Sequence, residues 1–87
     1  MSKFLCPCCD YVTLEERGVY DICPVCFWED EERDLDDLDR VSGPNHVTLR
    51  EARQNFADCG ACVPAMVKNV CSQEERKQYD RRSRTVD

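Results

Sequence analysis

The sequence predicts a small α+β domain stabilised by zinc, in which a zinc-ribbon-like β-hairpin with two Cys-Pro-x-Cys knuckles is followed by one or two short helices. The chain has only 87 residues, of which 8 are cysteine. A domain of this length buries too little apolar surface to be comfortably stable without crosslinks, so the cysteines are expected to supply them. The segments "LCPCCDY" at 5–11 and "ICPVCFW" at 22–28 share one pattern, and a helix-capping signal follows near residue 49.

The duplicated segment identifies the cysteines that form the knuckles. Each copy has an aliphatic residue, then Cys-Pro-x-Cys, then one residue and an aromatic, and the proline pre-sets the turn. The cysteines at matching positions are Cys6, Cys9, Cys23 and Cys26. Two thiolates from each knuckle suit one tetrahedral Zn²⁺, and four protein ligands leave no position for a bound water. We therefore predict one structural zinc ion and no enzymatic activity.

Cys8 is the odd member of the first knuckle, because it falls where Val25 stands in the second copy. We expect it to be a packed small residue or a free thiol. The alternative is that Cys8 and Cys9 exchange as ligands of the metal. The opening "MSKFLCPC" has no signal-peptide core, and no transmembrane run occurs. We expect a cytoplasmic protein without membrane contact. In the reducing cytoplasm, paired CxxC units are zinc sites more often than disulfides or catalytic dithiols.

Residues 1–30 are expected to form the zinc-ribbon unit, with its hairpin between the two knuckles. The intervening stretch "DYVTLEERGVYDI" alternates apolar and polar residues on both sides of "EERG". This alternation predicts two short strands, within 11–14 and 19–22, and Gly18 suits a positive-φ position in the turn that joins them.

An acidic segment follows the second knuckle. Residues 29–40 contain eight acidic and two basic side chains, a local charge of −6 that equals the net charge of the whole chain. We expect 31–46 to be an acidic connection, either a mobile loop or a helical turn placed on the ribbon by Leu35 and Leu38. A calcium loop is disfavoured, because the glycine and glutamate of an EF-hand are missing. The candidate partner-binding residues are Trp28, Asp34, Asp36 and Asp37.

The second half of the domain, 47–87, is expected to be helical. Thr48 and Glu51 form a capping box, and Gly60 suits the left-handed end of a helix over 49–59. The stripe at helical spacing on that helix comprises Leu49, Ala52, Arg53 and Phe56. A second capping box predicts a short helix over about 73–82, and the last few residues are expected to fray.

A second metal site is an alternative that the sequence does not exclude, because four further residues are of metal-ligating types. They are Cys59, Cys62, Cys71 and His46, with Cys8 as a further possible ligand. Free thiols and a hydrogen-bonded turn histidine are the preferred interpretation, because neither His46 nor Cys8 has supporting spacing. A redox pair in "CGAC" is disfavoured, because this motif follows the C-terminal end of a helix. That end lacks the positive dipole by which a helix N-terminus lowers a thiol pKa.

Three motifs resemble the CPCC family of small cysteine-rich bacterial proteins: "CPCCDY" at 6–11, "YDICPVCFWED" at 20–30 and "SGPNHVTLREARQNFADCGAC" at 42–62. The resemblance implies that the four knuckle cysteines are the family's zinc ligands, and that Trp28 and the Gly-Pro-Asn turn at 43–45 are structural. Cys59 and Cys71 depart from the expected pattern, which weakens the case for a second site. By resemblance, some members look like immunity proteins, encoded beside polymorphic toxins whose activity they block.

Two classes of function follow from these features. The first is a zinc-binding, acidic protein-interaction module of the immunity type, which binds and inhibits a cationic toxin domain. The alternative is a nucleic-acid-associated zinc-ribbon protein, because five basic side chains lie between 76 and 84. The acidic segment beside the second knuckle favours a cationic protein partner and disfavours nucleic acid.

Overall fold

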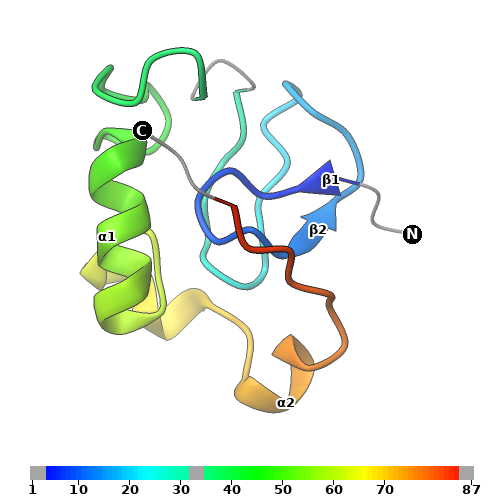
Figure 1. Ribbon diagram of the computed structural model, residues 1–87. Coiled ribbons are helices and arrows are strands. Elements are labelled where there is room, and N and C mark those ends of the chain that lie inside the picture. The colour runs from blue at the N-terminus through cyan, green and yellow to red at the C-terminus, as the bar shows by residue number, and fades with distance from the viewer. Residues whose placement is uncertain (1–3, 32–34, 85–87) are drawn as a thin grey trace.

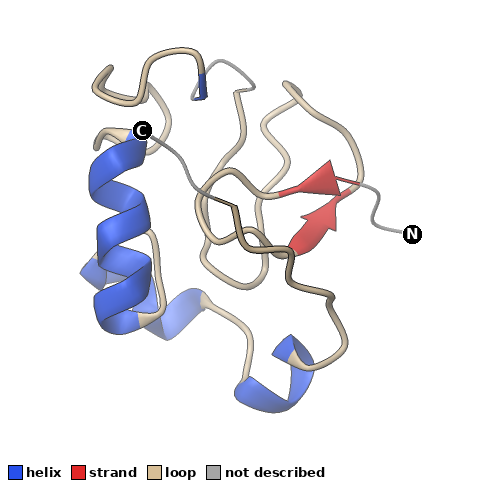
Figure 2. Cartoon of the chain, viewed as in Figure 1, coloured by secondary structure: helices blue, strands red, loops and turns tan. Residues whose placement is uncertain are grey.

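The computed structural model of the chain describes residues 4–31 and 35–84. The elements in chain order are β1 (Phe4–Leu5), β2 (Val12–Leu14), α1 (Leu49–Cys59), the 3-10 helix η2 (Pro64–Asn69) and α2 (Gln73–Arg76). Most of the described chain is loop (Figure 2), and the knuckle loops lie between α1 and the two-stranded sheet (Figure 1). A small domain with an antiparallel hairpin and short helices is thereby confirmed.

The hairpin encloses the first knuckle instead of following it. β1 and β2 pair in antiparallel orientation, with Phe4 opposite Leu14. The knuckle closes this hairpin, since the Cys6 N–H donates to the Tyr11 carbonyl oxygen at 2.8 Å. The predicted pairing between the two apolar arms of the intervening stretch is wrong, because β2 pairs with β1 along one edge and the chain at Tyr11 and Val12 pairs with residues 80–81 along the other.

The second knuckle repeats this backbone geometry. The Cys23 N–H donates to the Trp28 carbonyl oxygen at 2.9 Å, at the position equivalent to the bond that closes the first knuckle. Asp10 and Phe27, each placed directly after the second cysteine of a knuckle, adopt left-handed backbone with φ of 65° and 69°. The repeat in the sequence is therefore a repeat in the fold.

Helix α1 begins and ends as predicted. The Thr48 hydroxyl accepts a hydrogen bond from the Glu51 N–H at 3.1 Å, which satisfies an amide that lacks a partner inside the helix. Gly60 follows the last turn with φ of 84°, in the left-handed region that glycine enters without steric cost. Leu49 and Ala52 are buried in the same apolar cluster as the knuckle cysteines, so the helix covers the knuckles.

The core is built on the knuckles themselves. Trp28 is fully buried, and Cys8 and Val25, which occupy equivalent knuckle positions, are 2% and 0% exposed. Cys8 is thus the packed small residue that the alignment of the two copies predicts. Leu38 is buried and Leu35 packs against the core, so this part of the acidic connection is anchored on the ribbon. In the described part of the chain, no helix combines the length and hydropathy needed to cross a bilayer.

Helix α2 is shorter than predicted, although its start is correct. The Ser72 hydroxyl accepts a hydrogen bond from the Glu75 N–H at 3.2 Å, as the capping box requires. The helix covers only Gln73–Arg76 instead of extending to about residue 82. The Arg76 guanidinium lies over the Phe56 ring of α1, 5.3 Å from its centroid, so this short helix is attached to the longer one.

After α2 the chain returns to the first knuckle, where residues 80–84 form what we call the C-terminal segment (Figure 1). The Val12 N–H donates to the Asp80 carbonyl oxygen at 2.8 Å, and the Arg82 N–H donates to the Asp10 carbonyl oxygen at 2.9 Å. The backbone of this segment therefore pairs with the chain around the knuckle, and the fraying predicted for the last few residues is not tested by it. Residues 85–87 lie outside the described residues.

Candidate metal centre

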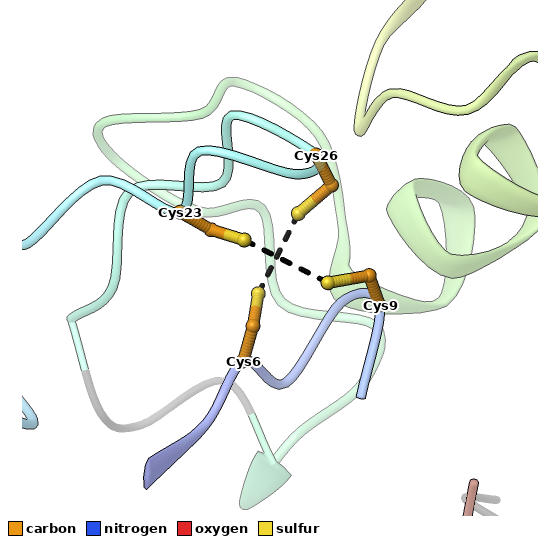
Figure 3. A group of neighbouring side chains, drawn as sticks. All are labelled: Cys6, Cys9, Cys23 and Cys26. Carbon is orange, nitrogen blue, oxygen red and sulfur yellow. Dashed lines mark hydrogen bonds between the residues drawn. The ribbon is translucent and has the colours of Figure 1, made fainter. Parts of the chain in front are cut away.

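The two knuckles bring four cysteines to one point. We call this set the cysteine cluster: Cys6, Cys9, Cys23 and Cys26. The four sulfur atoms all lie within 4.8 Å of one another, and all four residues are buried. The Cys6 and Cys26 sulfurs are 3.5 Å apart, and the Cys9 and Cys23 sulfurs are 3.7 Å apart. The first cysteine of each knuckle therefore faces the second cysteine of the other (Figure 3).

These separations fit a tetrahedral metal site. Every cysteine in the chain is a free thiol, in agreement with sulfur separations far beyond the roughly 2.05 Å of a disulfide. A zinc–sulfur bond of about 2.3 Å places the sulfurs of a regular tetrahedron about 3.8 Å apart. The two measured separations lie close to that value. The donor set thus has the number, chemistry and spacing that a tetrathiolate centre requires.

Burial opposes ionisation of the thiols in the cluster. It raises the pKa of Cys6 and Cys26 well above the ordinary value, and it also raises the pKa of Cys9. At Cys23 burial acts in the same direction, but hydrogen bonds from the other three thiols and from Thr13 outweigh it and lower the pKa. A cation at the centre would favour four thiolates instead of one, because a coordinated thiol loses its proton.

Thr13 places a hydrogen-bond donor next to this centre. Its hydroxyl donates to the Cys23 sulfur at 3.0 Å, and the residue is 5% exposed. The hydroxyl comes from β2, directly beyond the first knuckle, while the sulfur belongs to the second knuckle. Such contacts to ligand atoms orient the ligand and tune the affinity of a metal site.

The first knuckle is braced by two arginines that share one buried carboxylate. Asp10 is 1% exposed and accepts hydrogen bonds from the Arg53 guanidinium at 3.0 and 2.9 Å and from Arg84 Nε at 2.7 Å. Burial alone would raise the pKa of Asp10, but the bonds from Arg53 and Arg84 outweigh it and lower the pKa. The same guanidinium groups also donate to the carbonyl oxygens of Pro7 and Cys6. This ion triad fastens α1 and the C-terminal segment to the knuckle.

The second knuckle is braced by backbone hydrogen bonds from both sides of η2. The Cys62 N–H donates to the Cys26 carbonyl oxygen, and the Cys71 N–H donates to the Pro24 carbonyl oxygen, each at 2.8 Å. Cys62 is buried, and burial raises its pKa to about 12. A thiol with so high a pKa is a poor nucleophile at neutral pH, which argues against a redox pair with Cys59.

Among the described residues, the cysteine cluster is the only group of three or more side chains placed to hold a metal ion. The remaining cysteines differ in location, because Cys59 is exposed whereas Cys62 is buried. The Cys8 sulfur donates to the Ala52 carbonyl oxygen at 3.4 Å. His46 lies in the turn before α1 with φ of 64°, and its N–H donates to the Ser42 carbonyl oxygen.

The predicted partner-binding residues that the structure describes differ in their exposure to solvent. Trp28 is fully buried, so its assignment as a docking anchor is wrong, because its ring belongs to the core. Asp34 lies outside the described residues. Asp36 and Asp37 are exposed and remain accessible to a partner.

Much of the remaining acidic charge is matched by arginines. Three carboxylates of the acidic segment form ion pairs, and the pairs are Asp30 with Arg17, Glu31 with Arg40, and Asp39 with Arg50. Asp30 is also fully buried, and its carboxylate accepts the Gly18 N–H at 3.0 Å. The acidic segment therefore presents a weaker negative surface than its composition predicts.

The residues that support the centre were not predicted from the sequence. The helical spacing puts Arg53 on the apolar stripe of α1, and Arg84 falls beyond the predicted second helix, whereas both side chains bind Asp10. One signal was available at Asp10. It stands at the knuckle position that requires left-handed backbone, which aspartate tolerates better than most residues. The role of Thr13 had no comparable signal.

Comparison with curated proteins and with solved structures gave no match. The family described as "Cysteine-rich CPCC" matches residues 4–77. This range contains both knuckles, Asp10, Arg53 and α1, whereas the C-terminal segment lies beyond it. The match spans most of the sequence, and the chain therefore belongs to the cysteine-rich CPCC family.

Proposed function

We propose that this protein is a non-catalytic protein-binding module whose fold is held by one structural zinc ion at the cysteine cluster. The observation that carries the proposal is a set of four buried sulfurs, all within 4.8 Å of one another, that come from two separate segments of the chain. Four thiolates would saturate a tetrahedral ion, so the ion would crosslink the knuckles and leave no position for a substrate.

A structural role also agrees with what surrounds the cluster. Both knuckles are braced by hydrogen bonds from distant segments, and the cluster lies among the most buried residues of the core. For a chain of this size a metal crosslink is a common source of stability.

The partner that we propose is a cationic protein, and the module would act in the manner of an immunity protein that blocks a toxin domain. The support is the net charge of −6 together with the exposed carboxylates of Asp36 and Asp37. Charge of this sign accelerates association with a cationic surface.

The alternative, a nucleic-acid-associated zinc ribbon, has less support. Two of the five basic side chains between 76 and 84 contact the first knuckle, since Arg81 donates to the Cys9 carbonyl oxygen and Arg84 binds Asp10. A protein that binds phosphates needs such side chains on an accessible face.

Metal analysis of protein purified under reducing conditions tests the structural part of the proposal. The expected result is one zinc per chain, with loss of the folded circular dichroism spectrum on chelation. Iron in place of zinc would overturn the metal assignment, because four cysteines also suit iron. A metal-free protein that stays folded would overturn the structural role.

The partner is tested separately with the product of the neighbouring reading frame, titrated by calorimetry. Tight binding accompanied by loss of that product's activity is expected. The immunity assignment fails if the two proteins do not bind.

A further inference from the structure

A hollow opens on the loop between the two knuckles. We call it the loop hollow; it has a volume of about 510 Å³ and is lined by Glu15, Glu16, Val19, Tyr20, Asp21 and Ile22. None of these residues belongs to the cysteine cluster or to the ion triad around Asp10. The loop hollow is therefore a separate feature of the surface.

Three of the lining side chains are apolar and exposed. Val19, Tyr20 and Ile22 have exposed fractions of 55%, 58% and 42%. Single exposed apolar residues are ordinary, but several that gather at one hollow are typical of an interaction site. Tyrosine in particular is enriched among the residues that dominate binding energy.

The loop is held in place before any partner binds. Tyr20 adopts a left-handed backbone with φ of 62°, which costs energy for a residue other than glycine. Its N–H donates to the Asp30 carbonyl oxygen at 2.9 Å, and the buried Asp30 carboxylate accepts the Gly18 N–H. These bonds fix the loop on the second knuckle, so a partner would lose little affinity to ordering of the loop.

The rim of the loop hollow is acidic. Glu15, Glu16 and Asp21 lie on it, whereas Arg17, the one cation within 15–22, forms an ion pair with buried Asp30 at 2.7 Å. The pairing turns the positive charge of the loop toward the protein interior. The face left to a partner combines negative charge with apolar surface.

We propose that the loop hollow is the docking site for a basic segment of the partner protein, with an aliphatic or aromatic side chain of that segment packed against Tyr20 and Ile22. Lysine or arginine side chains of the same segment pair with Glu16 and Asp21. This inference rests on the proposed protein-binding function. The principal docking site in this proposal is the loop at 15–22, and not the acidic segment at 29–40.

The test is a nuclear magnetic resonance titration of ¹⁵N-labelled, zinc-reconstituted protein with a short peptide of alternating arginine and leucine. Two matched peptides serve as controls, one with glutamate in place of arginine and one with serine in place of leucine. We expect shifts concentrated at residues 15–22, and affinity at least about tenfold above that for either control.

Two variants make the test specific. Tyr20→Asn removes the ring but keeps a residue that tolerates the left-handed backbone, and it is expected to weaken binding by about tenfold or more. Val67→Asn alters an apolar side chain of η2 that is 46% exposed and lies outside the loop hollow, so its binding should match the wild type.

Other outcomes overturn the inference. Shifts centred on Asp36 and Asp37, with full binding by Tyr20→Asn, would leave the protein-binding function intact but reject this site. Absence of binding by the arginine–leucine peptide would reject the basic occupant. Self-association that Tyr20→Asn abolishes would show that the occupant is a second copy of this chain. The proposed function fails by different measurements, namely metal content and binding to the neighbouring gene product.

Discussion

Replacement of Asp10 by asparagine tests whether one buried carboxylate fastens α1 and the C-terminal segment to the first knuckle. Asparagine has nearly the same shape and tolerates the left-handed backbone at this position, where φ is 65°. The substitution therefore removes the charge without imposing new backbone strain. Arg53 and Arg84 would lose the negative charge between them. The amide oxygen can still accept hydrogen bonds, but the NH2 group would replace the carboxylate oxygen that now accepts from the Arg53 guanidinium and the Arg84 N–H.

The expected loss of stability follows from burial. Removal of one partner from a buried ion pair costs about 3–5 kcal/mol. The Arg53 and Arg84 side chains are 21% and 31% exposed, so water would solvate them in part. We therefore expect a loss of about 2–4 kcal/mol in the free energy of unfolding. With a urea dependence of about 1 kcal/mol per M for a small chain, the midpoint would fall by about 2–4 M.

The assay is urea unfolding of zinc-loaded protein, followed by circular dichroism. Arg84→Gln is the milder companion, expected to cost about 1–2 kcal/mol because the Arg53 pair remains. Asp39→Asn is the control, since its carboxylate is exposed and its ion pair with Arg50 should not measurably affect the midpoint. Midpoints of Asp10→Asn and wild type that agree within about 0.3 M would refute the bracing role.

The pH dependence gives a second check. Hydrogen bonds from Arg53 and Arg84 outweigh burial and hold the pKa of Asp10 below its ordinary value. The carboxylate is therefore ionised in both folded and unfolded protein above about pH 5, and its stabilisation is fully present there. The difference between wild type and Asp10→Asn should be constant from about pH 6 to 8. It should shrink only as the pH falls below about 4 and through the folded-state pKa.

Three further predictions concern the metal centre and the acidic surface. Cys23→Ser should abolish zinc retention and unfold the ribbon, whereas Cys8→Ser should keep one ion per chain, as measured by native mass spectrometry; equal loss in both would refute the alignment of the two knuckles. Thr13→Val should lower zinc affinity by about tenfold or more in competition with a chromophoric chelator, and unchanged affinity would show that its hydroxyl does not tune the site. Reversal of Asp36 and Asp37 to lysine should leave folding intact but slow association with the cationic partner, mostly at low salt, in stopped-flow measurements. Rates that do not change at low salt would exclude these residues from steering.

Local patterns identified the parts of this fold that depend on nearby residues. The two Cys-Pro-x-Cys copies specified which cysteines meet, because a turn of four residues fixes the direction of both of its thiols. The ends of α1 were equally predictable, since Thr48 caps amides within one turn and Gly60 supplies the left-handed residue that ends the helix.

The pairing of strands was not predictable in the same way. An alternating stretch such as 11–14 shows that one face is buried, but it does not say which neighbour supplies the hydrogen bonds. In the structure the knuckle turn itself joins β1 to β2, and residues 15–22 become a loop whose apolar side chains face solvent. The same alternation therefore belongs to strand β2 at 12–14 and, at 19–22, to an exposed loop that lines the hollow.

The sequence alone determined the cysteine cluster, the helix over 49–59 and the acidic bias of the chain, because each depends on residue types at short spacing. Only the tertiary structure decided that Trp28 is core, that several carboxylates are matched by arginines, and that the tail returns to the first knuckle. The partners of Asp10 lie 43 and 74 residues away in the chain. A buried ion triad between such distant positions leaves no local pattern, because it forms only after the surrounding segments have packed and excluded water.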